Sequence, residues 1–132
     1  MLVDSTDPIG PGAVLFTREF YGDCQKCLRP GGILVTQNGV PFVQGDELQS
    51  SVAYFRSLFK DAGAYVISCP TYALGFMALG WATDDADLRR LSLETIRARF
   101  DALGIDTQYY NPAVHVASFA LPNYMLKLID SA

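Results

Sequence analysis

The sequence predicts an α/β fold with a mostly parallel sheet, an antiparallel last strand and helices on both faces. Short apolar stretches alternate with amphipathic segments of helical period along the chain, which is the pattern of right-handed crossover units in a parallel sheet. The last two apolar stretches are separated by too few residues for a crossover helix, which predicts an antiparallel pair. Half of the 132 residues are hydrophobic and 12% are aromatic, so one domain can bury a core.

The chain begins at the end of a strand. Residues 2–3 are apolar, and the loop 4–12 follows, in which two prolines and two glycines within five positions exclude regular structure. Thr17 is placed to cap a helix whose apolar face combines Phe20, Tyr21, Cys24, Cys27 and Leu28. The Pro-Gly-Gly turn at residues 30–32 ends that helix, and residues 33–37 form the next apolar strand.

A second helix and two further strands repeat the alternation. Asp46 can cap this helix, and its apolar face recurs at helical spacing through Leu48, Val52, Phe55 and Phe59. Residues 61–63 are predicted to end the helix, and residues 64–68 to form a strand. Residues 70–75 are a connection, and residues 76–82 form the last strand.

The C-terminal part becomes more polar after residue 85. Ser92 can cap a helix over residues 93–103, and Gly104 stands at its C-terminal end. Four apolar side chains of this helix are expected to turn inward, namely Leu93, Ile96, Phe100 and Leu103. A last helical stretch is expected near residues 124–129.

Charge and composition exclude several classes of protein. The formal net charge is −4, whereas nucleic-acid binders carry clustered Lys and Arg. The charged fraction of 18% is below the roughly 25% typical of soluble domains, so we expect part of the surface to be covered. The sequence shows no basic n-region and no apolar run of ~18 residues, and its three cysteines do not make a disulfide framework. These observations predict a cytoplasmic protein that binds neither nucleic acid nor a membrane.

Polar residues follow three of the predicted strands. Asp4 and Asp7 come after the first strand, Gln37 ends the second, and Tyr72 follows the third. Ligands of open α/β sheets bind at the carboxyl ends of the strands, so these side chains are expected to line one crevice. Two acids three residues apart can grip a diammonium ligand or accept a proton from an amine, although Asp before Pro is also a common turn former. Spacing alone leaves both interpretations open.

Four segments, in order, resemble the spermidine and spermine synthase family. The first is Asp-Ser-Thr-Asp-Pro-Ile-Gly-Pro at residues 4–11, followed by Leu15-Phe16. The second is the turn 30–32 that leads to Gln37, the third is Pro-Thr-Tyr at residues 70–72, and the fourth is the strand that ends Trp-Ala-Thr at residues 81–83. The tail from Arg99 to Pro122 resembles the enterobacterial-type branch, so the resemblance covers nearly the whole chain.

The resemblance implies the C-terminal half of a Rossmann-like, methyltransferase-type sheet in a polyamine aminopropyltransferase. Asp4 matches the proton acceptor of the family, and the polyamine-binding residues are matched by Asp4, Asp7, Gln37 and Tyr72. Pro11 and Leu15 match residues that pack on the methylthioadenosine part of the donor. The implied spermidine synthase reaction transfers an aminopropyl group from decarboxylated S-adenosylmethionine, a co-substrate, to putrescine, and gives spermidine and methylthioadenosine.

This chemistry agrees with the residues present. A sulfonium is a good leaving group, so the reaction needs no metal, no other cofactor and no covalent nucleophile, only a positioned amine and one base. The Gly-rich nucleotide loop and the acid for the ribose, like the family's N-terminal β domain, do not precede Asp4. Residues 1–132 are therefore expected to form a partial catalytic domain, which works as a homodimer or a higher homo-oligomer.

Two alternatives stay open at the level of sequence. The chain can be a non-catalytic domain that keeps the fold and a subunit-contact surface, or the distal half of a methyltransferase, which shares this sheet. Cys24 and Cys27 are predicted to pack in the core, and His115, the only histidine, to be structural. A solvated helix face or a subunit contact is predicted for Arg89, Arg90, Arg97 and Arg99.

Overall fold

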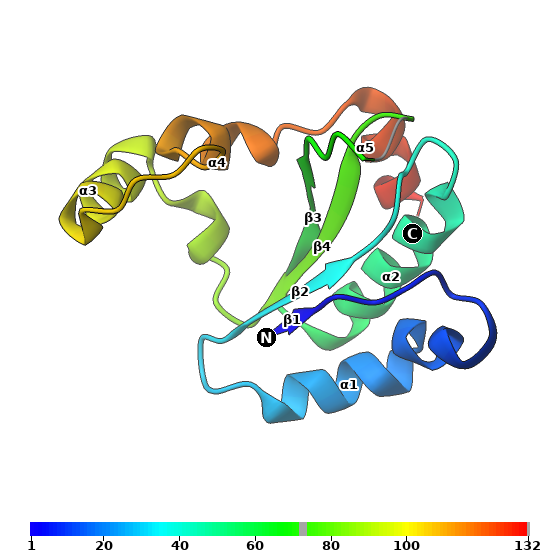
Figure 1. Ribbon diagram of the computed structural model, residues 1–132. Coiled ribbons are helices and arrows are strands. Elements are labelled where there is room, and N and C mark those ends of the chain that lie inside the picture. The colour runs from blue at the N-terminus through cyan, green and yellow to red at the C-terminus, as the bar shows by residue number, and fades with distance from the viewer. Residues whose placement is uncertain (72–73, 132) are drawn as a thin grey trace.

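The computed structural model describes residues 1–71 and 74–131 and shows alternating strands and helices (Figure 1). The sheet consists of β1 (Leu2–Val3), β2 (Ile33–Gln37), β3 (Asp61–Ile67) and β4 (Met77–Thr83). The α-helices are α1 (Arg18–Cys27), α2 (Gly45–Leu58), α3 (Leu93–Leu103), α4 (Pro112–Ser118) and α5 (Asn123–Asp130). Two short 3-10 helices are η1 (Gly10–Phe16) and η2 (Leu88–Arg90). In these described ranges, no helix combines the length and the apolar character that crossing a membrane requires.

The strands form one sheet in the order β1-β2-β4-β3. β1 and β2 are parallel, whereas β4 runs antiparallel to both of its neighbours, so β1, β2 and β3 share one direction. This confirms the predicted class, a mostly parallel sheet with an antiparallel last strand. The sequence does not predict that β4 lies between β2 and β3. Six of its seven residues are buried, as expected of a central strand that is covered on both faces.

One face of the sheet is covered by α1 and α2, and α5 packs on α2 (Figure 1). A buried cluster joins α2 and α5 to the sheet through Leu48, Val52, Ala64, Val66, Ala78, Met125 and Ile129. A second cluster joins α1 and α2 to the sheet through Tyr21, Cys24, Leu34, Phe55, Phe59 and Ala82. Burial of each large apolar side chain contributes about 1.5–3 kcal/mol, so these clusters hold the layer in place.

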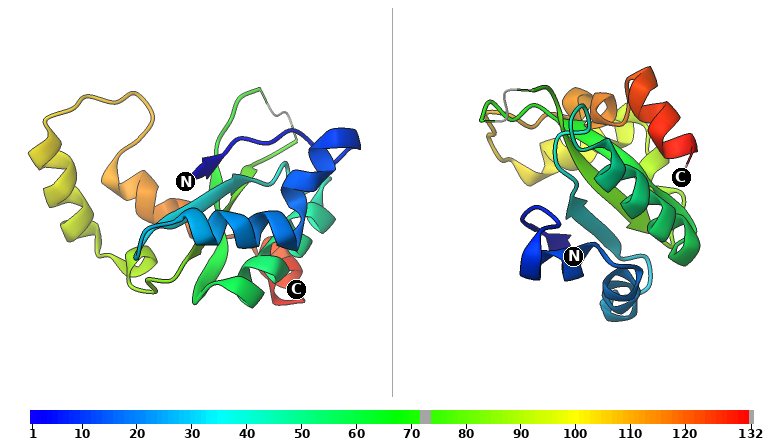
Figure 2. Two further views of the ribbon diagram at one scale, coloured as in Figure 1. Left: turned by 90° about the horizontal axis from the view of Figure 1, so that it is seen from below. Right: turned by 90° about the vertical axis from the view of Figure 1, so that its right-hand side faces the viewer.

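The second layer, α3 and α4, stands apart from α1 and α2 on the other side of the sheet (Figure 2). Phe119, which directly follows α4, packs against Tyr65 of β3 with ring centroids 5.3 Å apart and edge-on against Trp81 of β4 at 5.5 Å. Tyr65 alternates along β3 with Ala64 and Val66 of the α2 cluster, so its ring lies on the opposite face. Helices therefore occur on both faces, as predicted.

An ion pair with a buried carboxylate ties η2, the segment before α3, to the sheet. The guanidinium group of Arg89 in η2 donates to both carboxylate oxygens of Asp61, at 3.0 and 2.6 Å, and the indole N–H of Trp81 donates to the same carboxylate at 3.2 Å. Asp61 is 6% exposed, so these partners replace the water that a carboxylate needs. The prediction that Arg89 lies on a solvated face or at a subunit contact is wrong, because Arg89 binds within the chain.

Several predicted helix ends are confirmed at the level of hydrogen bonds. The side chain of Thr17 accepts from the backbone N–H of Phe20 at 3.2 Å, and that of Ser92 accepts from Thr95 at 3.2 Å. Gly104 ends α3 with a φ of 60°, a conformation that favours glycine. The prediction that Asp46 caps α2 is wrong, since the helix begins at Gly45.

Three other local predictions differ from the structure. β3 begins at Asp61 rather than residue 64, because Asp61 pairs with Thr83 of β4 and binds Arg89. Residues 10–12, the end of the predicted loop 4–12, belong instead to η1 (Gly10–Phe16). Pro11 stands in the first turn of η1, where a missing N–H leaves no hydrogen bond unmade. α4 is absent from the prediction, although Asn111 caps it by accepting from the N–H of Val114 at 2.9 Å.

Two side chains predicted to be inside are exposed. Cys24 is buried in the α1 face as predicted, but Cys27 at the end of that helix is exposed. Leu103 of α3 is 66% exposed, whereas Ile96 is buried. Both errors fall in the last turn of a helix.

Candidate functional site

The carboxyl ends of β1 and β2 bring Asp4 and Gln37 together. Val3 pairs with Thr36 in the parallel ladder, so Asp4, which follows β1, lies at the level of Gln37, the last residue of β2. Both residues line a cavity of about 310 Å³, together with Leu2, Val3, Val35, Tyr65, Ile67, Met77 and Leu79. The cavity thus has apolar walls made by the sheet and two polar groups at the strand ends. This is the crevice that the sequence predicts for these two residues.

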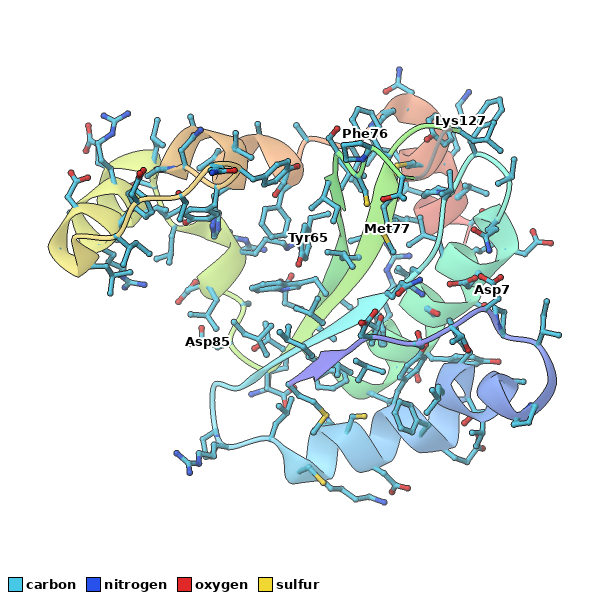
Figure 3. All side chains as sticks on the ribbon, viewed as in Figure 1. Asp7, Tyr65, Phe76, Met77, Asp85 and Lys127 are labelled. Atoms are coloured by element: carbon cyan, nitrogen blue, oxygen red, sulfur yellow. The ribbon has the colours of Figure 1, made fainter. Side chains whose placement is uncertain are left out.

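Asp7 lies further along the loop, beside the N-terminal end of α2 (Figure 3). Its carboxylate accepts a hydrogen bond of 3.1 Å from the side-chain amide of Gln44, and the amide oxygen of Gln44 accepts from the backbone N–H of Val40 at 2.9 Å. The loop itself is tight, because a Cβ on Gly12 would stand 2.8 Å from the hydroxyl oxygen of Thr6. Asp7 is therefore oriented by Gln44, which is itself fixed by Val40. It is not one of the residues that line the cavity of Asp4.

The remaining predicted residues are placed as follows. Tyr72 lies outside the described residues. Pro11 is exposed and Leu15 is half-buried, both on η1 after the loop that carries Asp4 and Asp7. Neither Pro11 nor Leu15 lines the cavity of Asp4 and Gln37. The structure thus brings Asp4 and Gln37 into one cavity and sets Asp7, Pro11 and Leu15 on the segment that borders it.

A third acid near Asp7 is not predicted from the sequence. Glu47 lies in the first turn of α2 and is half-buried. Burial, and in second place the negative charge of Asp7, raise the pKa of the Glu47 carboxyl from its ordinary 4.5 to about 7. In sequence this residue looks like an ordinary acid at a helix N-terminus; only the fold brings it close to Asp7. The loop and α2 together therefore present Asp7 and Glu47 as neighbouring acids.

Glu47→Gln is expected to change how stability depends on pH. The pKa of Glu47 is higher in the folded chain than in the unfolded one, so the wild type loses stability as pH rises from about 4.5 through 7. The free energy of unfolding should be the same in both proteins at pH 4 and about 1–2 kcal/mol higher in Glu47→Gln at pH 8; each pKa unit is worth about 1.36 kcal/mol, reduced here by solvent screening.

Urea unfolding at the two pH values measures this difference. Asp46→Asn is the matched control, because Asp46 is the exposed neighbour in the same helical turn, and it should not reproduce the gain at pH 8. Equal stability of Glu47→Gln and the wild type at both pH values would contradict the environment assigned to Glu47.

An aromatic cavity of about 280 Å³ lies beside the first one, under α4. Its walls include Tyr65 and Ile67, which also line the cavity of Asp4, and Trp81, Tyr110, His115 and Phe119. Tyr65 points from β3 toward the side of α4 (Figure 3). His115 Nδ1 is 3.1 Å from the hydroxyl of Tyr110, and burial lowers the pKa of its ring. A neutral histidine packed among aromatic rings fits the structural role predicted for it.

Comparisons with known proteins place these residues in a family. Residues 1–91 match the family described as "Spermine/spermidine synthase domain". The chain is 54% identical over 128 residues to a polyamine aminopropyltransferase of Ruegeria sp. (strain TM1040) and covers 45% of that protein. It is 49% identical over 132 residues to the polyamine aminopropyltransferase of Pseudomonas syringae pv. tomato and covers 46% of it. The chain thus spans slightly less than half the length of these curated relatives.

Solved structures agree with the fold and the family. A spermidine synthase in complex with the transition state analogue AdoDATO superposes with a TM-score of 0.83 at 31% identity, over 97% of this chain and 43% of that one. The spermidine synthase from Thermotoga maritima gives a TM-score of 0.79 at 29% identity, over 93% of this chain and 41% of that one. The Rossmann-like character of the sheet and the resemblance seen in the sequence are both confirmed. The chain belongs to the spermine/spermidine synthase family.

Proposed function

We propose that this chain is the polyamine-site half of a spermidine synthase, which transfers an aminopropyl group from decarboxylated S-adenosylmethionine to putrescine. The observation that carries the proposal is the meeting of Asp4 and Gln37 in one cavity at the carboxyl ends of β1 and β2. Asp7, held by Gln44, borders this site. The relatives named polyamine aminopropyltransferase and the spermidine synthase bound to a transition state analogue support the same reaction class.

In this proposal Asp4 is the proton acceptor. The amine nitrogen attacks the propyl carbon of the donor, the bond from that carbon to sulfur breaks, and methylthioadenosine leaves with the electron pair. The proton of the attacking amine goes to the Asp4 carboxylate. An alkylammonium loses its proton to water only near the Lys reference pKa of about 10.4, and only the neutral amine can attack. The Asp4 carboxylate is proposed to accept the proton that the nitrogen releases as its bond to carbon forms. Asp7, Gln37 and Tyr72 bind and orient the diamine without reacting.

In this proposal the binding site of the donor is formed partly by this chain and partly by another segment. Pro11 and Leu15 are proposed to pack on the methylthioadenosine part. We also propose that residues 1–132 are a partial catalytic domain, and that a nucleotide-binding half and a β domain outside them complete the site. The length of the relatives supports this, since the chain covers 45% and 46% of two of them.

The proposed assembly is a cytoplasmic homodimer or higher homo-oligomer. Cys24, Cys27 and Cys69 are all free thiols, which fits a reducing compartment. Leu2 on the outer strand β1 is 81% exposed, and an apolar edge strand is normally covered by further chain or by a partner. The same exposure favours a second candidate, in which these 132 residues alone are a non-catalytic piece that keeps the fold and a contact surface.

Gln37→Ala and Tyr72→Phe are expected to weaken putrescine binding more than donor binding. A hydrogen bond to a charged group contributes about 1.5–3 kcal/mol, so the dissociation constant for putrescine should rise by about 10–150-fold. Isothermal titration of the chain with putrescine, and separately with methylthioadenosine, measures both. Gln49→Ala is the matched control, because Gln49 is a glutamine on α2 whose side chain, among the residues that the structure describes, donates only to Ser131. Putrescine affinities equal to that of the wild type would contradict the proposed site.

A further inference from the structure

The residue that follows Gln37 is a fully buried asparagine. Asn38 is 0% exposed, and because side chains alternate along an extended chain, its amide points away from Gln37 into the layer between the sheet and α2. A buried amide without partners is costly, and this one has three. Its oxygen accepts from the hydroxyl of Thr36 at 2.7 Å and from the backbone N–H of Gly80 at 3.0 Å, and its nitrogen donates to Ser51 Oγ at 2.8 Å.

These partners belong to different elements of the fold. Thr36 is in β2, Gly80 in β4 and Ser51 in α2, and the Ser51 hydroxyl is 3.0 Å from the hydroxyl of Tyr21 in α1. Thr36, Ser51 and Tyr21 are all buried, with exposed fractions of 2%, 0% and 0%. Burial raises the pKa of Tyr21 to about 12, so the phenol stays neutral and keeps its hydrogen. One buried amide therefore connects the end of β2 to β4 and, directly or through Ser51, to both helices of the first layer.

The main chain around Asn38 is fixed as well. Its N–H donates to the carbonyl of Ala78 at 3.0 Å, and the N–H of Ala78 donates to the carbonyl of Gly39 at 2.9 Å. Gly80 leaves no room for a side chain, because a Cβ there would stand 2.5 Å from Asn38 Oδ1 and 2.6 Å from the ring of Phe55. Hydrogen bonds and close packing thus fix the end of β2 on both sides of the peptide bond between Gln37 and Asn38.

We infer that Asn38 is a positioning residue of the amine site, which holds Gln37 in place through the buried hydrogen bonds to Thr36, Ser51 and Gly80. This inference rests on the proposed function, since it assigns Gln37 to the diamine. Gln37 has a long side chain whose ordering on binding is unfavourable in entropy. When the main chain is fixed, the Gln37 side chain samples fewer orientations before the ligand binds, so less entropy is lost on binding. Supporting residues improve a binding site in this way. Asn38 acts through Gln37 and does not touch the ligand.

A double-mutant cycle tests whether Asn38 acts through Gln37. In the wild-type chain, Asn38→Leu should raise the putrescine dissociation constant about tenfold, measured by titration. In the Gln37→Ala background the same change should raise it less than about twofold, because a residue that acts through another loses its effect when the other is removed. Ser51→Ala is a milder second variant that deletes one partner of the Asn38 amide, and its smaller effect should vanish in the same background.

Two further measurements separate positioning from a general loss of structure. Thr83→Val is the control: Thr83 is also buried and hydrogen-bonded, to the carbonyl of Gly32, but at the other end of β4, so it should lower the melting temperature and leave the dissociation constant unchanged. Nuclear relaxation of the Gln37 side-chain amide should show greater mobility in Asn38→Leu and not in Thr83→Val. Equal effects of Asn38→Leu in both backgrounds, or an unchanged Gln37 amide, would overturn the inference. A wild-type chain that binds no putrescine would instead contradict the proposed function.

Discussion

Asp4→Asn is expected to reduce aminopropyl transfer by about 10²–10⁴-fold, because removal of a general base typically has this effect on rate. The assay uses a polypeptide that joins this chain to the upstream half of one of its relatives, so that the donor can bind. Asn keeps the size of Asp, and the neighbouring Ser5 is buried, so the loop should keep its shape. The measurement is methylthioadenosine formed in a single turnover from decarboxylated S-adenosylmethionine and putrescine.

The dependence on pH identifies the role of Asp4. The deficit of Asp4→Asn should shrink as pH rises toward about 10, where the amine loses its proton to water without help. Asp7→Asn is the matched variant on the same loop, and it should raise the KM for putrescine more than it lowers kcat, because Asp7 is assigned to binding. A variant at Asp4 that turns over normally across the pH range would exclude this residue as the base.

A polypeptide limited to these 132 residues is expected to show turnover at least about 10³-fold below that of the joined polypeptide. Binding energy from the ribose and adenine of the donor also positions the reacting carbon, and Pro11 and Leu15 supply only one side of that pocket. The loss should therefore appear in kcat as well as in KM. Methylthioadenosine release by the two polypeptides, under the same conditions, gives the ratio directly.

The same polypeptide is expected to associate with itself through the open edge of the sheet. Leu2 on β1 is 81% exposed. Within residues 1–71 and 74–131, β1 pairs only with β2, so its other edge can pair with another chain. Light scattering should show a dimer or larger species, and Leu2→Lys should shift it toward the monomer, since an edge lysine opposes such pairing. A clean wild-type monomer with turnover like that of the joined polypeptide would contradict both expectations.

Local signals in the sequence were enough to predict most of the helices and strands. The strand at residues 33–37 and the helix at 93–103 have the predicted bounds, because a Pro-Gly-Gly turn, an N-capping serine and a C-terminal glycine act within a few residues. The antiparallel direction of the last strand also followed from local information, namely the short connection after β3. These features need no knowledge of what lies across the sheet.

The residues of the candidate site were found by two different routes. Asp4 and Gln37 could be placed together from the sequence, because the ends of neighbouring parallel strands meet at one edge. The roles of Glu47 and Asn38 could not be predicted from the sequence. Glu47 looks like an ordinary acid at the start of a helix, and Asn38 looks like a turn residue. Their environments depend on Asp7, Ser51 and other side chains that are distant in sequence.

The sequence by itself determined the order of the four strands and of the helices other than α4, the caps of α1 and α3, the direction of β4 and the meeting of Asp4 with Gln37. Only the tertiary structure decided that β4 lies between β2 and β3, that β3 begins at Asp61, which pairs with Thr83 and binds Arg89, and that Asn38 is buried under the site. The physical reason is how far apart in the sequence the contacting residues lie. Caps and periodicity arise from contacts within one or two turns of chain, whereas strand order, buried ion pairs and buried amides depend on partners that only the folded chain brings together.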